Sequence, residues 1–143
     1  MNETIEKFGY PGTLVADYAH WVVLLRPKQA TLGALVLACK EDALAFGDIS
    51  QEAASELKRA SADIEAALTQ AFSYDKINYL MLMMVDPQVH FHVLPRYSET
   101  REFQGRRFED PGWPAVPNLG AAAETDSEMN AAILAEIKRA WPA

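Results

Sequence analysis

The sequence predicts an α+β fold in which an antiparallel sheet packs against helices, and three observations support this prediction. Short apolar runs rich in β-branched residues occur in adjacent pairs, as in antiparallel strands. A long amphipathic helix is expected between the two pairs, and a shorter one near the C-terminus. Residues 1–143 contain no internal repeat or linker, so one domain with a usable core is expected.

The first pair of strands is predicted at residues 21–25 and 34–39, where tryptophan, valine and leucine predominate. Proline and glycine punctuate the connector, so a hairpin with a long loop is expected. Residues 1–13 are expected to form an irregular lead-in. Cys39 is the only cysteine, which excludes an intrachain disulfide, and its apolar neighbours predict a buried, unreactive thiol.

A long helix is predicted from Asp48 or Ser50, both good N-cap residues, to about residue 72. Apolar residues recur along it at helical spacing, so this stripe is expected to pack in the core rather than to bind a cofactor. The stripe consists of Leu57, Ala60, Ile64, Ala67, Leu68 and Ala71.

The second pair of strands is predicted at residues 77–85 and 88–94, with a turn at Asp86-Pro87 between them. Pro95 is expected to end the second strand because proline cannot donate to a central ladder. Asn78 is the one polar residue in the first run. Its buried amide is therefore expected to form a hydrogen bond, either with the backbone or with a ligand.

The C-terminal part is predicted to contain an irregular loop and then a helix. Residues 110–117 include three prolines, and Trp113 is expected to pin this loop to the body of the protein or to another subunit. Thr125 and Glu128 form a capping box that predicts a helix start. The apolar stripe of this helix is Met129, Ile133, Ile137 and Trp141, and Pro142 is expected to end it.

The net charge of −7 argues against general binding to nucleic acid or to an anionic membrane. A local basic stretch nevertheless follows the last predicted strand, where it could bind a phosphate group or simply form a solvated loop. Its arginines are Arg96, Arg101, Arg106 and Arg107. Since no apolar run is long enough to span a membrane and no signal peptide opens the chain, a cytoplasmic location is expected.

Gln88, His90 and His92 are expected on one face of their strand, because side chains alternate between the two faces. Val89 and Phe91 would then point into the core. A metal site would need a further ligand from elsewhere. The other readings are an unreactive pair and nucleophilic attack by a neutral imidazole on a phosphate ester or anhydride. The third histidine, His20, is isolated before the first strand and is expected to be structural or at the surface.

The run from Gln88 to Arg96 reads Gln-Val-His-Phe-His-Val-Leu-Pro-Arg and resembles the signature of the histidine triad superfamily, in which histidines alternate with hydrophobic residues. It is most similar to a bacterial branch that has glutamine in place of the first histidine and a Trp-Pro pair downstream. Similar features at Gly33, at residues 76–79 and at Trp113-Pro114 extend the resemblance over residues 15–118.

The resemblance implies a histidine-triad-like fold, with an antiparallel sheet of about five strands, one long helix and a C-terminal helix. It also implies a two-fold homodimer. The implied activity is that of a nucleotide hydrolase or transferase, which cleaves a phosphoanhydride or phosphoramidate bond at the α-phosphate through a nucleotidyl-histidine intermediate. Dinucleoside polyphosphates and nucleoside phosphoramidates are the implied substrates, and neither a metal nor a cofactor is implied.

The resemblance also assigns roles to individual residues. His90 takes the position of the nucleophile, and the backbone carbonyl of His92 is expected to accept its other ring proton. The side chain of His92 is expected to contact phosphate oxygens, and Asn78 to lie near them. Gln88 can form hydrogen bonds at the first triad position, but it cannot carry a proton charge.

Two further positions depart from the family pattern. Ala34 stands where many members have histidine, and residues 22–26 contain no clear equivalent of the residue that usually binds the ribose hydroxyls. Arg26 and Arg96 are the expected additional substrate contacts. The altered pocket keeps an alternative open, in which the chain is a weakly catalytic or non-catalytic nucleotide- or anion-binding module with the same fold.

Overall fold

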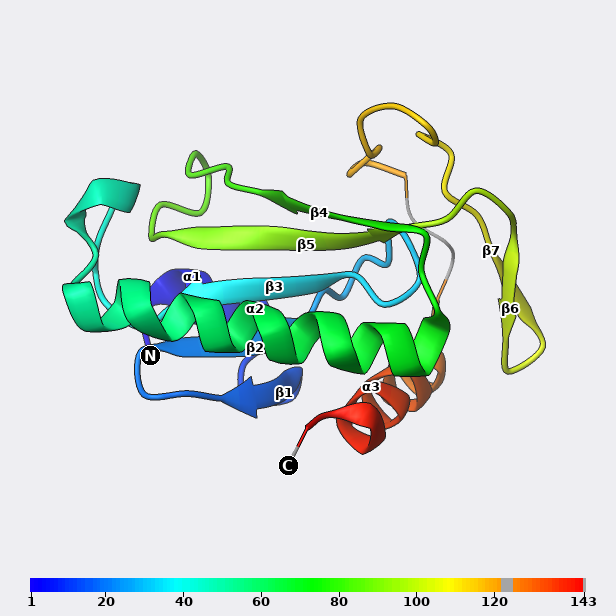
Figure 1. Cartoon of the computed structure of the whole chain (residues 1–143), viewed down its shortest axis with the longest axis horizontal. Coiled ribbons are helices and arrows are strands. Elements are labelled where there is room, and N and C mark those ends of the chain that lie inside the picture. The colour runs from blue at the N-terminus through cyan, green and yellow to red at the C-terminus, as the bar shows by residue number, and fades with distance from the viewer. Residues whose placement is uncertain (122–124, 143) are drawn as a thin grey trace.

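The computed structural model describes residues 1–121 and 125–142, in which an antiparallel sheet has helices on both faces (Figure 1). Its five strands have the order β1-β2-β3-β5-β4, and all neighbouring strands are antiparallel. This arrangement confirms the predicted α+β fold. The strands are β1 (Leu14–Asp17), β2 (Trp21–Leu25), β3 (Leu35–Cys39), β4 (Lys76–Leu80) and β5 (His90–Arg96).

The helices are α1 (Glu3–Lys7), α2 (Gln51–Phe72) and α3 (Ser127–Ala140), with a short 3₁₀ turn, η1, at Phe46–Asp48. A separate two-stranded hairpin, β6 (Arg101–Phe103) with β7 (Arg106–Phe108), projects beyond one end of the sheet (Figure 1). Three arginines of the basic stretch, Arg101, Arg106 and Arg107, lie in this hairpin, whereas Arg96 is the last residue of β5. No helix in the described part of the chain combines the length and apolar character that crossing a membrane requires.

The two faces of the sheet have separate apolar clusters. Val23, Leu37 and Val93 belong to the large cluster that also contains the buried stripe of α2. On the other face, Ile5 of α1 packs against residues of β2 and β3. Because strand side chains alternate, the even-numbered residues of β5 lie on the α1 face and the odd-numbered residues on the α2 face.

The predicted helix and first hairpin are confirmed. Ser50 is the N-cap of α2, and its side chain accepts a hydrogen bond from the backbone N–H of Ala53. Gly33, at the turn before β3, has a φ of +88°, and a Cβ there would lie 2.9 Å from the ring of Phe72. A side chain at Gly33 would therefore be strained in backbone conformation and would also collide with the end of α2.

Two predicted segments are wrong. The lead-in at residues 1–13 is not wholly irregular but contains α1, because Asn2 caps the helix and Ile5 is fully buried against the sheet. The run at residues 77–85 remains in the sheet only as far as Leu80, although the sequence is apolar throughout. Met84 and Val85 are more than 80% exposed, so apolar composition alone overextended this strand.

The sequence predicted that Pro95 would end its strand, and this is wrong, because Pro95 lies within β5. The ladder between β3 and β5 ends at the Leu35–Val93 pair, so beyond it β5 has a neighbour only on the β4 side. Arg96 directs its carbonyl to that side, where it accepts a hydrogen bond from Asp75. The nitrogen of Pro95 consequently points to the open side, where no donor is required.

The C-terminal helix is confirmed except for its cap. Asp126, not Thr125, is the N-cap residue, and its carboxylate accepts a hydrogen bond from the N–H of Met129. Ile133 and Ile137 are fully buried, and Trp141 packs against the same cluster. α3 thus covers the sheet beside α2.

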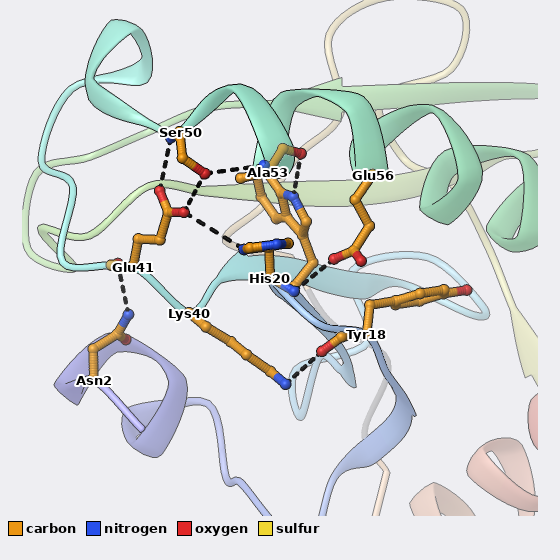
Figure 2. A network of polar contacts seen from close by, with 9 residues as sticks. Asn2, Tyr18, His20, Lys40, Glu41, Ser50, Ala53 and Glu56 are labelled. Atoms are coloured by element: carbon orange, nitrogen blue, oxygen red, sulfur yellow. Dashed lines mark hydrogen bonds and ion pairs between the residues drawn. The ribbon is translucent and has the colours of Figure 1, made fainter.

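A polar network fixes the ends of three elements around Glu41 (Figure 2). The carboxylate of Glu41 accepts from the N–H of Ser50 at 2.9 Å and from its hydroxyl, and it lies 3.6 Å from Nδ1 of His20. The backbone carbonyl of Glu41 accepts from the amide of Asn2 at 3.2 Å. Nearby, Glu56 accepts from the N–H of His20 at 2.6 Å. Glu41 therefore connects the start of α2 with β3 and α1.

The pKa of Glu41 is lowered from its ordinary value, first because Ser50 donates two hydrogen bonds to the carboxylate. A lowered carboxyl pKa contributes stability above the pKa of the unfolded chain, and this contribution is lost as the pH falls through the folded value. We expect Glu41→Gln to lower the free energy of unfolding by about 0.5–1 kcal/mol at neutral pH. The ordinary pKa of this carboxyl is 4.5. Below that pH, we expect the variant to lose less stability on acidification than the wild type does.

Urea unfolding at a series of pH values measures this effect. Glu99→Gln, which changes an exposed loop carboxylate, serves as the matched control and should behave as the wild type. Parallel loss of stability on acidification in the Glu41 variant and the wild type would contradict the assignment.

Candidate active site

The two histidines of β5 lie side by side on the α1 face of the sheet, as the alternation predicted. Their ring centroids are 5.1 Å apart, and the rings are nearly perpendicular. β5 lies between β3 and β4, and His92 pairs with Val36 on one side and Leu80 on the other. His90 is fully buried, and His92 is only 6% exposed. The sheet thus holds both imidazoles at fixed positions in its interior.

The Nδ1 atom of His90 lies 2.7 Å from the backbone carbonyl oxygen of Gln88. A carbonyl can only accept, so Nδ1 must carry the proton, and Nε2 of the neutral ring keeps a free lone pair. The carbonyl of His92, which the resemblance implied as this acceptor, is therefore the wrong one. Gln88 precedes β5, so its carbonyl is available to the ring, whereas His92 lies within the ladders to β3 and β4.

Each imidazole has a buried ring nitrogen without a hydrogen-bond partner in the described part of the chain. Nε2 of His90 and Nδ1 of His92 are buried, and neither has a hydrogen-bond partner among the described residues. A buried polar atom without a partner carries a desolvation cost that a bound ligand can relieve. The unpartnered nitrogens therefore identify this face as a candidate ligand site.

The pKa of His92 is lowered to about 4, first by burial and then by the positive charge of Arg26 and the neighbouring His90. His92 is consequently neutral at neutral pH. A neutral imidazole can donate or accept a hydrogen bond, but it has no excess proton to transfer.

The segment around α1 covers the histidines. The ring centroid of Phe8 lies 5.7 Å from that of His90 and also 5.7 Å from that of His92. Thr4 and Lys7 hold this segment near β5. Thr4 forms hydrogen bonds with the side chain and the backbone N–H of Gln88, and Lys7 pairs with Asp86 at 2.6 Å. The expected interaction of Gln88 through its side chain is thus made with α1.

Arg96 and Asn78 lie together at the opposite end of the same face. Nε and one terminal nitrogen of Arg96 donate to the fully buried carboxylate of Asp110, at 2.6 and 3.1 Å. The other terminal nitrogen donates to Oδ1 of Asn78 at 2.7 Å, which confirms that the amide is hydrogen-bonded. Because Oδ1 is engaged, the amide nitrogen of Asn78 is left as the donor for another group.

Asn78 also lines a groove of about 780 Å³ between β4 and the proline-rich loop. Lys76 and Leu80 line it from β4, and Trp113 lines it from the loop. Leu80 is the Cα partner of His92, so one end of the groove lies beside the histidines. Trp113, which is predicted to pin this loop, is half-buried and lines the groove together with residues of β4.

Arg101 and His20 are engaged in contacts within the protein rather than in the candidate site. Arg101 donates to the backbone carbonyl of Phe72 at 2.7 Å, and its guanidinium stacks on Tyr97 at 4.9 Å. His20 belongs to the Glu41 network (Figure 2). Within residues 1–121 and 125–142, no three histidine, cysteine, aspartate or glutamate side chains are grouped as metal ligands.

Sequence reasoning missed Phe8, Thr4 and Asp110. Phe8 and Thr4 lie more than 80 residues from the histidines in sequence, and the short α1 has too few turns to show a helical period. Asp110 precedes a proline in a segment without periodicity. An acidic residue flanked by proline and glycine was the only available signal, and it is more typical of a turn than of a buried ion pair.

Comparison with solved structures places this geometry in a known fold. A histidine triad protein from Sinorhizobium meliloti matches with a TM-score of 0.75 and 21% identity, covering 98% of this chain and 95% of that chain. A histidine triad protein from Marinobacter aquaeolei gives a TM-score of 0.75 and 19% identity, over 99% and 94% of the two chains.

A hypothetical histidine triad nucleotide-binding protein from Sulfolobus tokodaii matches with a TM-score of 0.69 and 15% identity, covering 96% of this chain and 88% of that chain. No protein-family model and no curated protein matches the sequence. The structural likeness extends over nearly the whole chain and includes the strand that carries the histidines. The chain therefore has the histidine triad fold.

Proposed function

We propose that the chain is a nucleotide hydrolase or transferase of the histidine triad type. In this proposal His90 attacks the α-phosphorus of a nucleotide, and water hydrolyses the resulting nucleotidyl-histidine. The observation that carries the proposal is the hydrogen bond between Nδ1 of His90 and the carbonyl of Gln88. It leaves a lone pair on Nε2, which is what an imidazole nucleophile requires.

The neighbouring residues support phosphoryl chemistry through hydrogen bonds and charge. The side chain of His92 lies beside the nucleophile and is proposed to contact phosphate oxygens. Gln88 acts as a positioning residue, because its carbonyl orients the ring of His90. Stabilisation of phosphoryl oxygens by fixed dipoles and charges supplies the rest of the catalysis, as is general for such transfers.

Asn78 is proposed to bind substrate through its amide nitrogen. Arg96 holds the amide oxygen and is itself held by Asp110, so the orientation of Asn78 is fixed before a ligand arrives. All three contacts of the Arg96 guanidinium are internal. We therefore assign Arg96 to positioning Asn78, a more indirect role in substrate binding than the sequence suggested.

The second candidate function is that of a non-catalytic nucleotide- or anion-binding module, and the burial of His90 favours it. Nε2 of His90 is buried beneath the segment that carries Phe8. Turnover requires this segment to move aside, whereas an anion-binding module could use only the exposed margin of the site. Access to His90 therefore separates the two functions.

We further propose that the protein is cytoplasmic and acts as a two-fold homodimer. β4 is an edge strand, and it contains no proline to block pairing with another strand. Apolar side chains at Leu82, Met84 and Val85 are exposed just beyond it. A second copy of the chain would cover both features.

The central prediction concerns a covalent adduct. Mixing the protein with an adenylated substrate, followed by quenching in alkaline denaturant to preserve a P–N bond, should give an adduct of one nucleoside monophosphate by intact mass. His90→Ala should remove the adduct and lower kcat by about 10³-fold or more, because the nucleophile is lost.

His20→Gln is the matched control, since it changes a histidine outside the site, and it should keep both adduct and turnover. If neither adduct nor turnover is found across adenylated and guanylated substrates while a nucleotide still raises the unfolding temperature, the binding module is the correct function.

A second prediction concerns access to the nucleophile. Phe8→Ala should remove the cover over both imidazoles, and the reaction of His90 with diethylpyrocarbonate should become about tenfold faster or more. Peptide mapping by mass spectrometry measures the modification at each histidine. Phe103→Ala, which removes a partly buried aromatic ring in β6, is the control and should leave the rate at His90 unchanged. Equal rates in the Phe8 variant and the wild type would show that this ring does not limit access.

A further inference from the structure

Arg26 reaches the histidine-bearing face from the end of β2. Its backbone N–H donates to the carbonyl of Ala34 at 3.0 Å, and so continues the β2–β3 pairing by one residue. Its guanidinium donates to the carbonyl of Leu119 at 3.4 Å, and Leu119 packs against Ala34 and Leu94. Leu94 is on the same face of β5 as His92. The side chain of Arg26 therefore lies over the part of the sheet that adjoins His92.

The charge of Arg26 is not matched within the described residues. Its contacts are the carbonyls of Lys28 and Leu119, and it has no ion-pair partner in residues 1–121 and 125–142. Nε is buried without a hydrogen bond, and burial lowers the pKa of the guanidinium. Arg96 at the other end of the face is instead neutralised by Asp110. A partly buried cation with an unused donor is suited to an anionic group of a ligand.

The site also contains few groups that can donate a proton to a leaving group. The pKa of His92 is lowered by burial and by Arg26, so its ring is neutral at neutral pH. Gln88 has no acidic proton, and a guanidinium does not release one. An amine leaving from phosphorus must be protonated, because the amide anion is far too basic, whereas a phosphate leaves as a stable anion without general acid assistance.

We propose that Arg26 is a specificity residue that binds the anionic leaving group beyond the reacting phosphorus, and that the site therefore selects phosphoanhydrides over phosphoramidates. This inference rests on the proposed function. It narrows the substrate to nucleotides whose α-phosphate is joined through oxygen to a further phosphate.

The proposed cleavage takes two steps. Nε2 of His90 forms a bond to the α-phosphorus, the bridging P–O bond breaks, and its electron pair leaves with the second phosphate, whose negative charge Arg26 stabilises. Water then attacks the same phosphorus, and the P–N bond breaks. The electron pair returns to Nε2, and the proton of water passes to solvent. No proton is needed by the leaving group in the first step.

Steady-state kinetics on two substrates with the same adenylyl group test this assignment: diadenosine triphosphate and an adenosine 5′-phosphoramidate with a neutral amine. The wild type should prefer the triphosphate in kcat/KM. Arg26→Gln should lower kcat/KM for the triphosphate by about ten- to a hundredfold, the effect of one charge-assisted contact, and should change the phosphoramidate by less than about threefold. Lys28→Gln, at an exposed neighbouring cation, should change neither.

Arg26→Lys keeps the positive charge and should therefore retain most of the preference for the triphosphate. If Arg26→Gln proves unstable, this variant still tests whether the charge matters. Equal losses on both substrates, or a wild-type preference for the phosphoramidate, would overturn the role of Arg26 and leave the proposed function standing. Absence of turnover and of adduct with both substrates would overturn the proposed function and this inference together.

Discussion

The alternation of side chains along β5 is the constraint on which the rest of the structure depends. This strand lies between β3 and β4, and its side chains are buried on both faces of the sheet. Val89 and Val93 are fully buried in the large core on the α2 side, which fixes the register of the strand. The same register presents His90 and His92 on the opposite face. A slip of one residue would bury the histidines in the core and expose the valines, so core packing and site geometry are set together.

Charge on the histidine face is distributed unevenly between two arginines. Arg96 is paired with a carboxylate that is fully buried, and the pair serves to hold Asn78 and the loop that contains Asp110. Arg26 has only backbone carbonyls as partners among the described residues, and it acts on His92. Within a chain of net charge −7, this leaves a local positive region next to the proposed nucleophile. Such a region attracts phosphate even though the protein as a whole repels polyanions.

Local sequence patterns predicted the long helices and most of the strands. The helical period predicted α2 and α3, and the apolar runs predicted β2, β3 and the start of β4. The failures depend on tertiary contacts. Met81 to Val85 are apolar but lack a neighbouring strand, and Pro95 is tolerated because β3 has ended beside it. The strand spacing predicted the histidine row, but the acceptor for His90 depends on where β5 begins.

The residues that complete the site could not be read from spacing because they come from distant segments. Phe8 approaches the histidines only because α1 folds back over the sheet, and Asp110 reaches Arg96 from an irregular loop. Conversely, a residue that the sequence placed near substrate, Arg96, is held by internal partners. The sequence thus predicted the row of histidines better than it predicted the residues that cover them.

The central claim is that the carbonyl of Gln88 fixes the proton of His90 on Nδ1 and leaves Nε2 free to attack. Two-bond ¹H–¹⁵N correlation spectra of the ¹⁵N-labelled protein, with His90 assigned by comparison with His90→Ala, report this tautomer directly. We expect a protonated Nδ1 and a non-protonated Nε2 for His90 near neutral pH. A proton on Nε2 with a free Nδ1 would show that the ring cannot act as the proposed nucleophile in this conformation.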